Sequence, residues 1–132
     1  MIKYKKRKKY KYNLHSDKDY STGIKVDKPK NGKLLQIDAK GELVIKAGYS
    51  WDGPSGPTID TKNFMQGSLV HDALYQLMRE GHIDPSNRKK ADKILRKICR
   101  EDGMSRLRAW WVYRGVRLGG KSAVKPDLLT AP

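Results

Sequence analysis

A run of backbone-breaking residues in the middle of the chain limits the fold more than any other part of the sequence. Residues 48–61 hold three glycines and two prolines. Glycine costs conformational entropy inside a helix or strand, and proline removes a backbone donor, so this segment suits neither a helix nor a central strand. We therefore interpret it as a shaped loop between two differently patterned halves of the chain.

The half before this loop has the pattern of short β-strands. Turn-forming residues at 27–32 precede two apolar runs, 34–38 and 43–45, which flank Ala39-Lys40-Gly41. Apolar runs on both sides of a glycine-containing turn are typical of a β-hairpin. Residues 20–26 are more polar and turn-rich. The sequence predicts a β-hairpin layer in this half.

The half after the loop has helical periodicity. We expect helices over about 63–80, 84–103 and 105–118, with Asp84-Pro85 as a cap and first-turn pair. The predicted buried stripes lie at residues 70, 74, 77 and 78 of the first helix and at residues 91, 94, 95 and 98 of the second. The sequence thus predicts an α+β fold in which an N-terminal β-hairpin layer is followed by three helices, two of them forming an antiparallel pair.

Length and composition indicate one folded domain. The 132 residues, 37% of them apolar, can bury one hydrophobic core but not two. We expect a basic N-terminal arm over 1–19, a single α+β domain over 20–120 and a loosely held tail over 121–132. With a single cysteine, Cys99, the chain has no internal disulfide, which favours a reducing compartment or a virus particle. We expect Cys99 to be a small buried side chain.

No apolar run approaches the length of a membrane span, and the first dozen residues lack the apolar stretch of a signal peptide. We therefore expect the chain in a virion or in the host cytoplasm. Its 29 basic and 14 acidic residues give a net charge of +15, and seven of the first twelve residues are Lys or Arg. That segment is interpretable as a solvated arm, a charged edge strand, a non-specific nucleic-acid contact or a contact with an anionic membrane.

The chemically informative motif is His71-Asp72-Ala73-Leu74-Tyr75, followed by a second acid at Asp92. Helices joined by a short link pack antiparallel, so His71 of the first helix can face Asp92 of the second. A carboxylate that accepts from one imidazole nitrogen fixes the tautomer and stabilises the imidazolium that forms when the other nitrogen takes a proton from water. The alternative is a structural pair that only ties two helices together.

These residues resemble the core of the phospholipase A2 superfamily, especially its short disulfide-free form in parvovirus capsid proteins. The resemblance rests on the loop with Gly53, Gly56 and Pro57, then on Asp60, His71-Asp72-x-x-Tyr75 and Ala91-Asp92. It implies that His71 is the catalytic base, that Asp92 supports it and that Tyr75 forms a hydrogen bond near the pair. It also implies that Asp72 ligates calcium together with loop carbonyl groups, of Trp51, Gly53 and Ser55.

The chain also resembles, from about residue 48 to residue 119, small phage and prophage proteins of unknown function. Those proteins carry Gly-Phe-x-Thr-Asp-x-x-Ser-x-Pro, His-Asp-x-Leu-Tyr and Arg-x-x-Ala-Asp, and here the first motif places Asp52 at the position of its acid. The loop lacks the Tyr-x-Gly-x-Gly order of the phospholipases. A second arrangement therefore stays open, in which Asp52, His71, Asp72 and Asp92 ligate a transition metal or orient one another.

Three functions fit these observations. The first is a phage-associated hydrolase that cuts phospholipid esters during entry or lysis, with a phospholipid membrane as its partner. The second is a non-catalytic capsid or tail protein that binds virion proteins or genome through its charge. The third is a nucleic-acid-binding protein that uses residues 1–12. Trp110 and Trp111 are expected to pack in the core or in an interface rather than against lipid.

Overall fold

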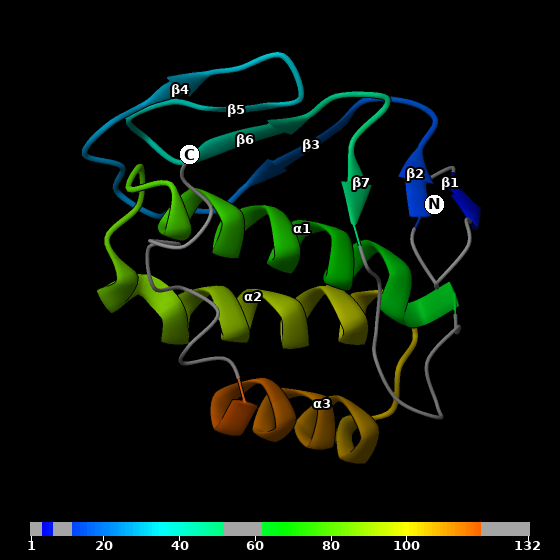
Figure 1. Cartoon of the computed structure of the whole chain (residues 1–132). Coiled ribbons are helices and arrows are strands. Elements are labelled where there is room, and N and C mark those ends of the chain that lie inside the picture. The colour runs from blue at the N-terminus through cyan, green and yellow to red at the C-terminus, as the bar shows by residue number, and fades with distance from the viewer. Residues whose placement is uncertain (1–3, 7–11, 52–61, 120–132) are drawn as a thin grey trace.

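The computed structural model describes residues 4–6, 12–51 and 62–119, and side chains within 12–51 and 63–119. In these ranges strands come first and helices follow (Figure 1), which confirms the predicted α+β class. The strands are β1 (Tyr4–Lys6), β2 (Tyr12–Leu14), β3 (Lys18–Ser21), β4 (Lys30–Asn31), β5 (Leu35–Ile37), β6 (Glu42–Ile45) and β7 (Ser50–Trp51). The helices are α1 (Lys62–Arg79), a 3-10 turn η2 (Pro85–Asn87), α2 (Arg88–Glu101) and α3 (Arg106–Gly119).

The larger sheet is antiparallel, with the order β3-β6-β5-β4. It contains the predicted hairpin, in which Leu35 of β5 lies opposite Ile45 of β6 and Ile37 lies opposite Leu43. All four side chains are buried, because alternate residues of a strand point to the same face. The turn between these strands has Gly41 at φ +86°, a conformation that favours glycine.

The smaller sheet has the order β1-β2-β7, and it draws part of the predicted basic arm into the fold. Tyr12 and Leu14 of β2 are 2% and 1% exposed, so the folded part of the chain begins before residue 20, where the sequence placed the boundary. Residues 12–14 are folded because they form a strand that pairs with β7, where Tyr12 lies opposite Trp51. Residues 1–3 and 7–11, with the other basic residues of this segment, and residues 120–132, which contain the predicted tail, lie outside the described residues.

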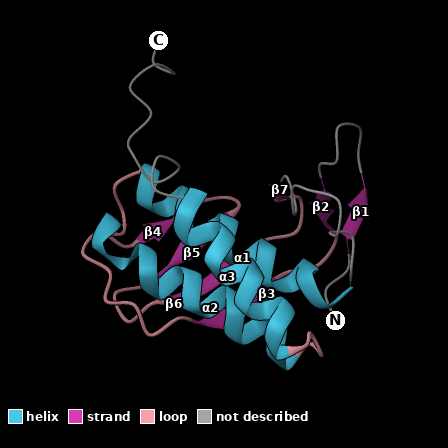
Figure 2. Cartoon of the chain, turned by 90° about the horizontal axis from the view of Figure 1, so that it is seen from below, coloured by secondary structure: helices cyan, strands magenta, loops and turns pink. Residues whose placement is uncertain are grey.

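The helices form successive layers below the strands, with α1 nearest the sheets, then α2, then α3 (Figure 1). Seen from below, the three helices cover the larger sheet, while β1 and β2 lie to one side (Figure 2). Helices α1 and α2 run antiparallel, as predicted. Their predicted stripes are buried, and together with the strands they enclose the main core: Val70, Leu74, Leu77 and Met78 from α1, and Ala91, Ile94 and Ile98 from α2.

Two local features set how α1 and α2 meet. A Cβ atom at Gly67 would lie 2.9 Å from Leu95 Cδ1 and 3.0 Å from Cys99 Sγ, so glycine permits the close approach of the two helices. The Asp84 side chain accepts a hydrogen bond from the Ser86 amide at 2.8 Å, as predicted for a cap, and starts the 3-10 turn that leads into α2. Cys99 is buried, as expected.

Helix α3 packs on α2 through Ala109, Val112 and Val116, which contact Leu95 and Cys99 in a second apolar cluster. Trp110 and Trp111 lie outside this inner stripe. Trp110 is 45% exposed and Trp111 is 62% exposed, so neither packs in the core, and of the two predicted placements only an interface is left. No helix among the described residues is long and apolar enough to span a bilayer.

Candidate functional site

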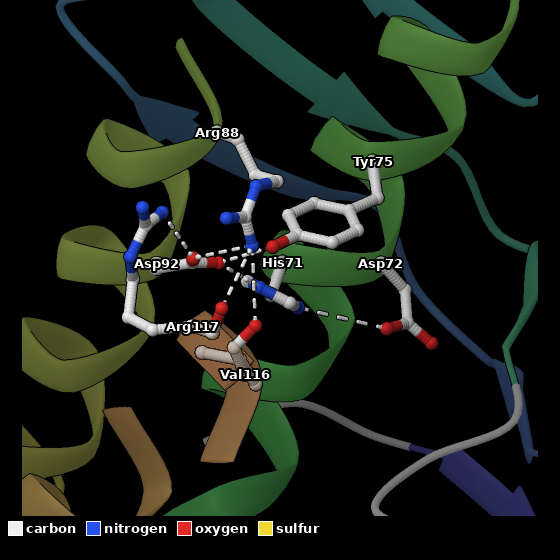
Figure 3. A network of polar contacts seen from close by, with 7 residues as sticks. All are labelled: His71, Asp72, Tyr75, Arg88, Asp92, Val116 and Arg117. Atoms are coloured by element: carbon white, nitrogen blue, oxygen red, sulfur yellow. Dashed lines mark hydrogen bonds and ion pairs between the residues drawn. The ribbon is translucent and has the colours of Figure 1, made fainter. Parts of the chain in front are cut away.

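His71 and Asp92 meet across the α1–α2 interface (Figure 3). The His71 Nε2 atom lies 2.7 Å from Asp92 Oδ1, so the contact predicted from helix pairing is confirmed. Both residues lie on the inward faces of their helices, and Asp92 is 0% exposed while His71 is 7% exposed. A buried carboxylate is costly unless it is hydrogen-bonded, so the surroundings of Asp92 decide whether it can remain ionised.

Asp92 is surrounded by hydrogen-bond donors. The Tyr75 hydroxyl donates to Oδ1 at 2.5 Å, and Arg117 Nη1 donates to Oδ2 at 2.9 Å. Arg88 Nη1 lies 3.7 Å from Oδ2, one helical turn earlier on α2. Burial raises the pKa of Asp92, but hydrogen bonds from His71, Tyr75 and Arg117 outweigh burial and hold it below the ordinary value of 3.8. Asp92 is therefore an anion at neutral pH.

The ionised carboxylate also fixes the tautomer of His71. A carboxylate only accepts hydrogen bonds, so His71 Nε2 carries the proton and Nδ1 has the free lone pair in the neutral ring. Nδ1 faces Asp72, whose Oδ1 lies 3.9 Å away, which is longer than a hydrogen bond. The Asp72 side chain is 36% exposed and that of Asp92 is 0% exposed. The basic nitrogen thus points toward the more solvent-exposed of the two acids.

The pKa of His71 reflects these two acids. Burial lowers it, but the nearby carboxylates of Asp72 and Asp92 raise it more, and the net pKa lies above the ordinary value of 6.5. Tyr75 lies one turn later on α1, and its ring centroid is 4.1 Å from that of His71. Burial and then the Asp92 charge raise the pKa of Tyr75 well above 10, so it stays a neutral donor. Tyr75 restrains both the imidazole ring and the carboxylate.

Sequence reasoning did not find the role of Arg117, which reaches Asp92 from α3. It lies 25 residues from Asp92, on a helix whose orientation the sequence did not define, so no spacing rule points to it. Arg88 carried a usable signal, because it lies one helical turn before Asp92. Arg88 Nη1 also donates to the backbone oxygens of Val116 and Arg117, at 3.3 and 3.4 Å, and so satisfies carbonyl groups at the end of α3.

The predicted metal ligands are only partly described. Asp72 is partly exposed on the side of His71 Nδ1, whereas Asp52, Gly53 and Ser55 lie outside the described residues. Within the described ranges, no group of three or more His, Cys, Asp or Glu side chains could hold a metal ion. Calcium binds about six to eight oxygen atoms, so Asp72 has suitable donor chemistry but supplies only part of such a shell.

The direct hydrogen bond between His71 and Asp92 bears on the second metal arrangement. In the structure His71 Nε2 and Asp92 Oδ1 lie 2.7 Å apart, within hydrogen-bond distance, so these two side chains orient one another. Of the four residues in that arrangement, His71 is hydrogen-bonded to Asp92 through Nε2, and Asp72 lies near its Nδ1 atom. Asp52 lies outside the described residues.

Trp51, the last residue of β7, packs against α1. Its Nε1 atom donates to Ser68 Oγ at 3.1 Å, and its side chain is buried. Ser68 lies about one turn before His71 on α1. The last described residue of β7 is therefore held against the same helix that carries His71, Asp72 and Tyr75.

Comparisons with known proteins bear on the site as a whole. A family model described as "Protein of unknown function (DUF1353)" matches residues 33–116. The match includes β5, β6, β7, α1, α2 and most of α3, with His71, Asp72, Tyr75, Arg88 and Asp92. Comparison with curated proteins and with solved structures gave no match. Because the matched residues make up more than half of the sequence, this chain belongs to the DUF1353 family.

Proposed function

We propose that this protein is a hydrolase of the phospholipase A2 type that cleaves an ester bond of phospholipids. The observation that carries the proposal is the 2.7 Å hydrogen bond from His71 Nε2 to Asp92, which leaves Nδ1 as a base on the side of Asp72. A base held by a buried acid, with its second nitrogen turned toward a more exposed acid, has the parts required to activate water. The resemblance in sequence to the phospholipase A2 core supports the same reaction.

His71 is the catalytic residue of the proposed mechanism. Its Nδ1 atom takes a proton from a water molecule as the water oxygen bonds to the carbonyl carbon of the ester. The resulting imidazolium is stabilised by Asp92 through Nε2–H. The tetrahedral intermediate then collapses, the bond from carbon to the glycerol oxygen breaks, and His71 returns the proton to that oxygen. The products are a fatty acid and a lysophospholipid.

Asp92 and Tyr75 are positioning residues in this scheme. Asp92 fixes the tautomer, and its ionisation depends on the donors around it. Tyr75 donates to the same carboxylate oxygen and its ring packs against the imidazole, so a ring flip that turned the basic nitrogen inward would break the bond from Nε2 to Asp92. Arg117 partly neutralises Asp92, which keeps the pKa of His71 lower than two unbalanced carboxylates would set it.

Calcium is the cofactor of the proposal. Asp72 would hold it with Asp52, Gly53 and Ser55, three residues of the segment that follows Trp51. When bound, calcium supplies positive charge that polarises the ester carbonyl. Asp72 suits this role because its carboxylate is partly exposed. Its Oδ1 atom lies 3.9 Å from His71 Nδ1, which is longer than a hydrogen bond.

The proposed setting is a virus particle or the host cytoplasm, where the enzyme acts on a host membrane during phage entry or lysis. This setting is supported by the resemblance to small phage and prophage proteins. The net charge of +15 favours contact with anionic surfaces, which include phospholipid bilayers and nucleic acids.

The test is the release of fatty acid from a phospholipid labelled in its sn-2 chain. We expect the wild-type protein to release that chain with calcium and not with a chelator, and His71→Asn to be slower by about a hundredfold or more, because a general base contributes about that factor. The Asn amide is shorter than the imidazole and does not reach the Nε2 position that donates to Asp92, so a thermal melt checks that this variant is folded. No release by wild type on anionic or zwitterionic phospholipid, or equal release by His71→Asn, overturns the proposal.

A second candidate function is that of a non-catalytic capsid or tail component. It is favoured by one observation: Asp92 accepts from His71 of α1 and from Arg117 of α3, so the network ties three helices together without any chemistry. In that case the chain would co-purify with virus particles, and wild type and His71→Asn would bind the particles equally. Absence of the chain from purified particles would contradict this second function.

A further inference from the structure

Large exposed apolar side chains gather on one face of α3. Leu107 is 68% exposed, Trp111 is 62% exposed and Leu118 is 76% exposed. They lie at positions i, i+4 and i+11, which share one side of an α-helix. Trp110, 45% exposed, lies beside them, and among the described residues only Leu34 is another large exposed apolar side chain. We call Leu107, Trp110, Trp111, Arg114 and Leu118 the α3 face.

The α3 face is on the side of the helix that is not used for packing. Ala109, Val112 and Val116 form the opposite side and contact α2. Helix α3 is the outermost of the three helical layers in Figure 1. An apolar stripe of this kind on an outer helix indicates an interaction surface, because scattered single residues are normal on a protein surface but a contiguous group is not.

The charges on α3 indicate what this surface contacts. The helix carries four arginines and no acidic residue. Arg106 and Arg114 are exposed, and the Arg114 guanidinium lies 5.7 Å from the centre of the Trp110 ring. Tryptophan and leucine with arginine among them suit the boundary between headgroups and acyl chains, where indole rings lie at headgroup level and arginine binds phosphate.

We infer that the α3 face docks on the surface of an anionic phospholipid bilayer, with the helix lying in the plane of the interface. A second copy of the chain is a poorer occupant, because it would bring two arginine-rich faces of like charge together. The inference rests on the proposed function for its purpose, since the bilayer is the source of the ester substrate. The same helix supplies Arg117 to Asp92, so the docking element and the site are joined directly.

The experiment measures binding of the full chain to sedimenting vesicles of phosphatidylcholine, with and without phosphatidylglycerol. It uses the His71→Asn background, so that vesicles stay intact. We expect binding to vesicles that contain phosphatidylglycerol and little binding to phosphatidylcholine alone. A blue shift of tryptophan emission should accompany binding, since Trp51 is buried and cannot report it while Trp110 and Trp111 can.

The matched variants are Leu107→Ser with Trp111→Ser on the α3 face and Leu34→Ser elsewhere. We expect the double variant to lose about tenfold or more in vesicle affinity, because each buried apolar side chain contributes substantially to binding, and Leu34→Ser to bind as before. Arg106→Gln with Arg114→Gln should weaken binding several-fold and reduce its dependence on salt. All four positions are exposed, so thermal melts of the α3 variants should match that of the parent.

Equal vesicle binding by the double variant and Leu34→Ser overturns the inference. So does absence of binding to anionic vesicles, or a concentration-dependent dimer that the double variant abolishes. Failure of docking is distinguishable from failure of the proposed function. If the chain hydrolyses a short-chain monomeric phospholipid but binds no vesicles, only the docking inference is contradicted. If the wild-type chain binds vesicles but hydrolyses no phospholipid, only the proposed function is contradicted.

Discussion

Arg117 of α3 donates a hydrogen bond to Asp92 Oδ2 at 2.9 Å, while His71 occupies the other oxygen of the same carboxylate at 2.7 Å. The acid that orients the proposed base is therefore held from both sides, by α1 and by α3. Because Asp92 is 0% exposed, each of these donors replaces hydration that the carboxylate loses on folding. The stability of the helical layers and the chemistry of His71 thus depend on one side chain.

Asp92→Asn should destabilise the fold by about 3–5 kcal/mol, because the amide removes the charge and sets an N–H group against one of the donors around it. Urea unfolding measures this change. Asp102→Asn is the matched control at an exposed position at the end of α2, and it should change the free energy of unfolding by less than about 0.5 kcal/mol. Similar midpoints and slopes for the two variants would contradict the network described above.

Arg117→Gln should lower stability by about 1–3 kcal/mol, because it removes a charged hydrogen bond from a buried carboxylate. Arg114→Gln, on the exposed side of α3, should change stability by less than about 0.5 kcal/mol. Without the positive charge of Arg117, the negative charge of Asp92 is less compensated, so the pKa of His71 should rise. The measurable sign is an upward displacement of the pH at which hydrolysis reaches half its maximum, which a purely structural Arg117 would not cause.

Gly67→Ala should destabilise the α1–α2 interface by about 1–3 kcal/mol, because the new methyl group would lie 2.9 Å from Leu95 Cδ1 and 3.0 Å from Cys99 Sγ. Gly115→Ala is the control on α3, where a Cβ atom would meet nothing within 4 Å. That change should stabilise the chain by up to about 1 kcal/mol through helix propensity. Two effects of the same sign would show that the helices do not approach at Gly67.

The pH dependence of stability follows from the raised pKa of His71. Burial lowers this pKa, but Asp72 and Asp92 raise it more, so the folded chain binds the proton more tightly than the unfolded chain does. The stabilisation is fully present below the unfolded pKa of about 6.5 and is lost as the pH rises through the folded value. The difference in unfolding free energy between wild type and His71→Asn should therefore shrink above about pH 6.5. A constant difference across that range would contradict the raised pKa.

Much of the fold and of the candidate site could be predicted from the sequence, for a definite physical reason. His71 and Asp92 lie on strongly periodic stripes of two helices joined by a short link, and local periodicity with antiparallel packing is enough to bring them together. The hairpin of β5 and β6 was predictable because its apolar residues alternate around a glycine turn.

The remaining features depend on contacts between distant parts of the chain. Strand β2 is three residues long and pairs with β7, so its burial follows from a partner far along the sequence. The exposure of Trp110 depends on which side of α3 meets α2, and the smaller Ala109 takes the inner position. Arg117 reaches Asp92 only through that same orientation. None of these relations leaves a local pattern.

The most direct test of the proposed mechanism compares two titrations of the same group. Nuclear magnetic resonance of the His71 ring nitrogens reports its tautomer and pKa, and kcat/KM for fatty acid release reports the pKa of the group that must be deprotonated. We predict a neutral ring protonated at Nε2, a pKa above 6.5, and a rate that rises with pH through that same value. A rate that stays constant while His71 titrates, or a neutral ring protonated at Nδ1, would contradict the role of His71 as the base.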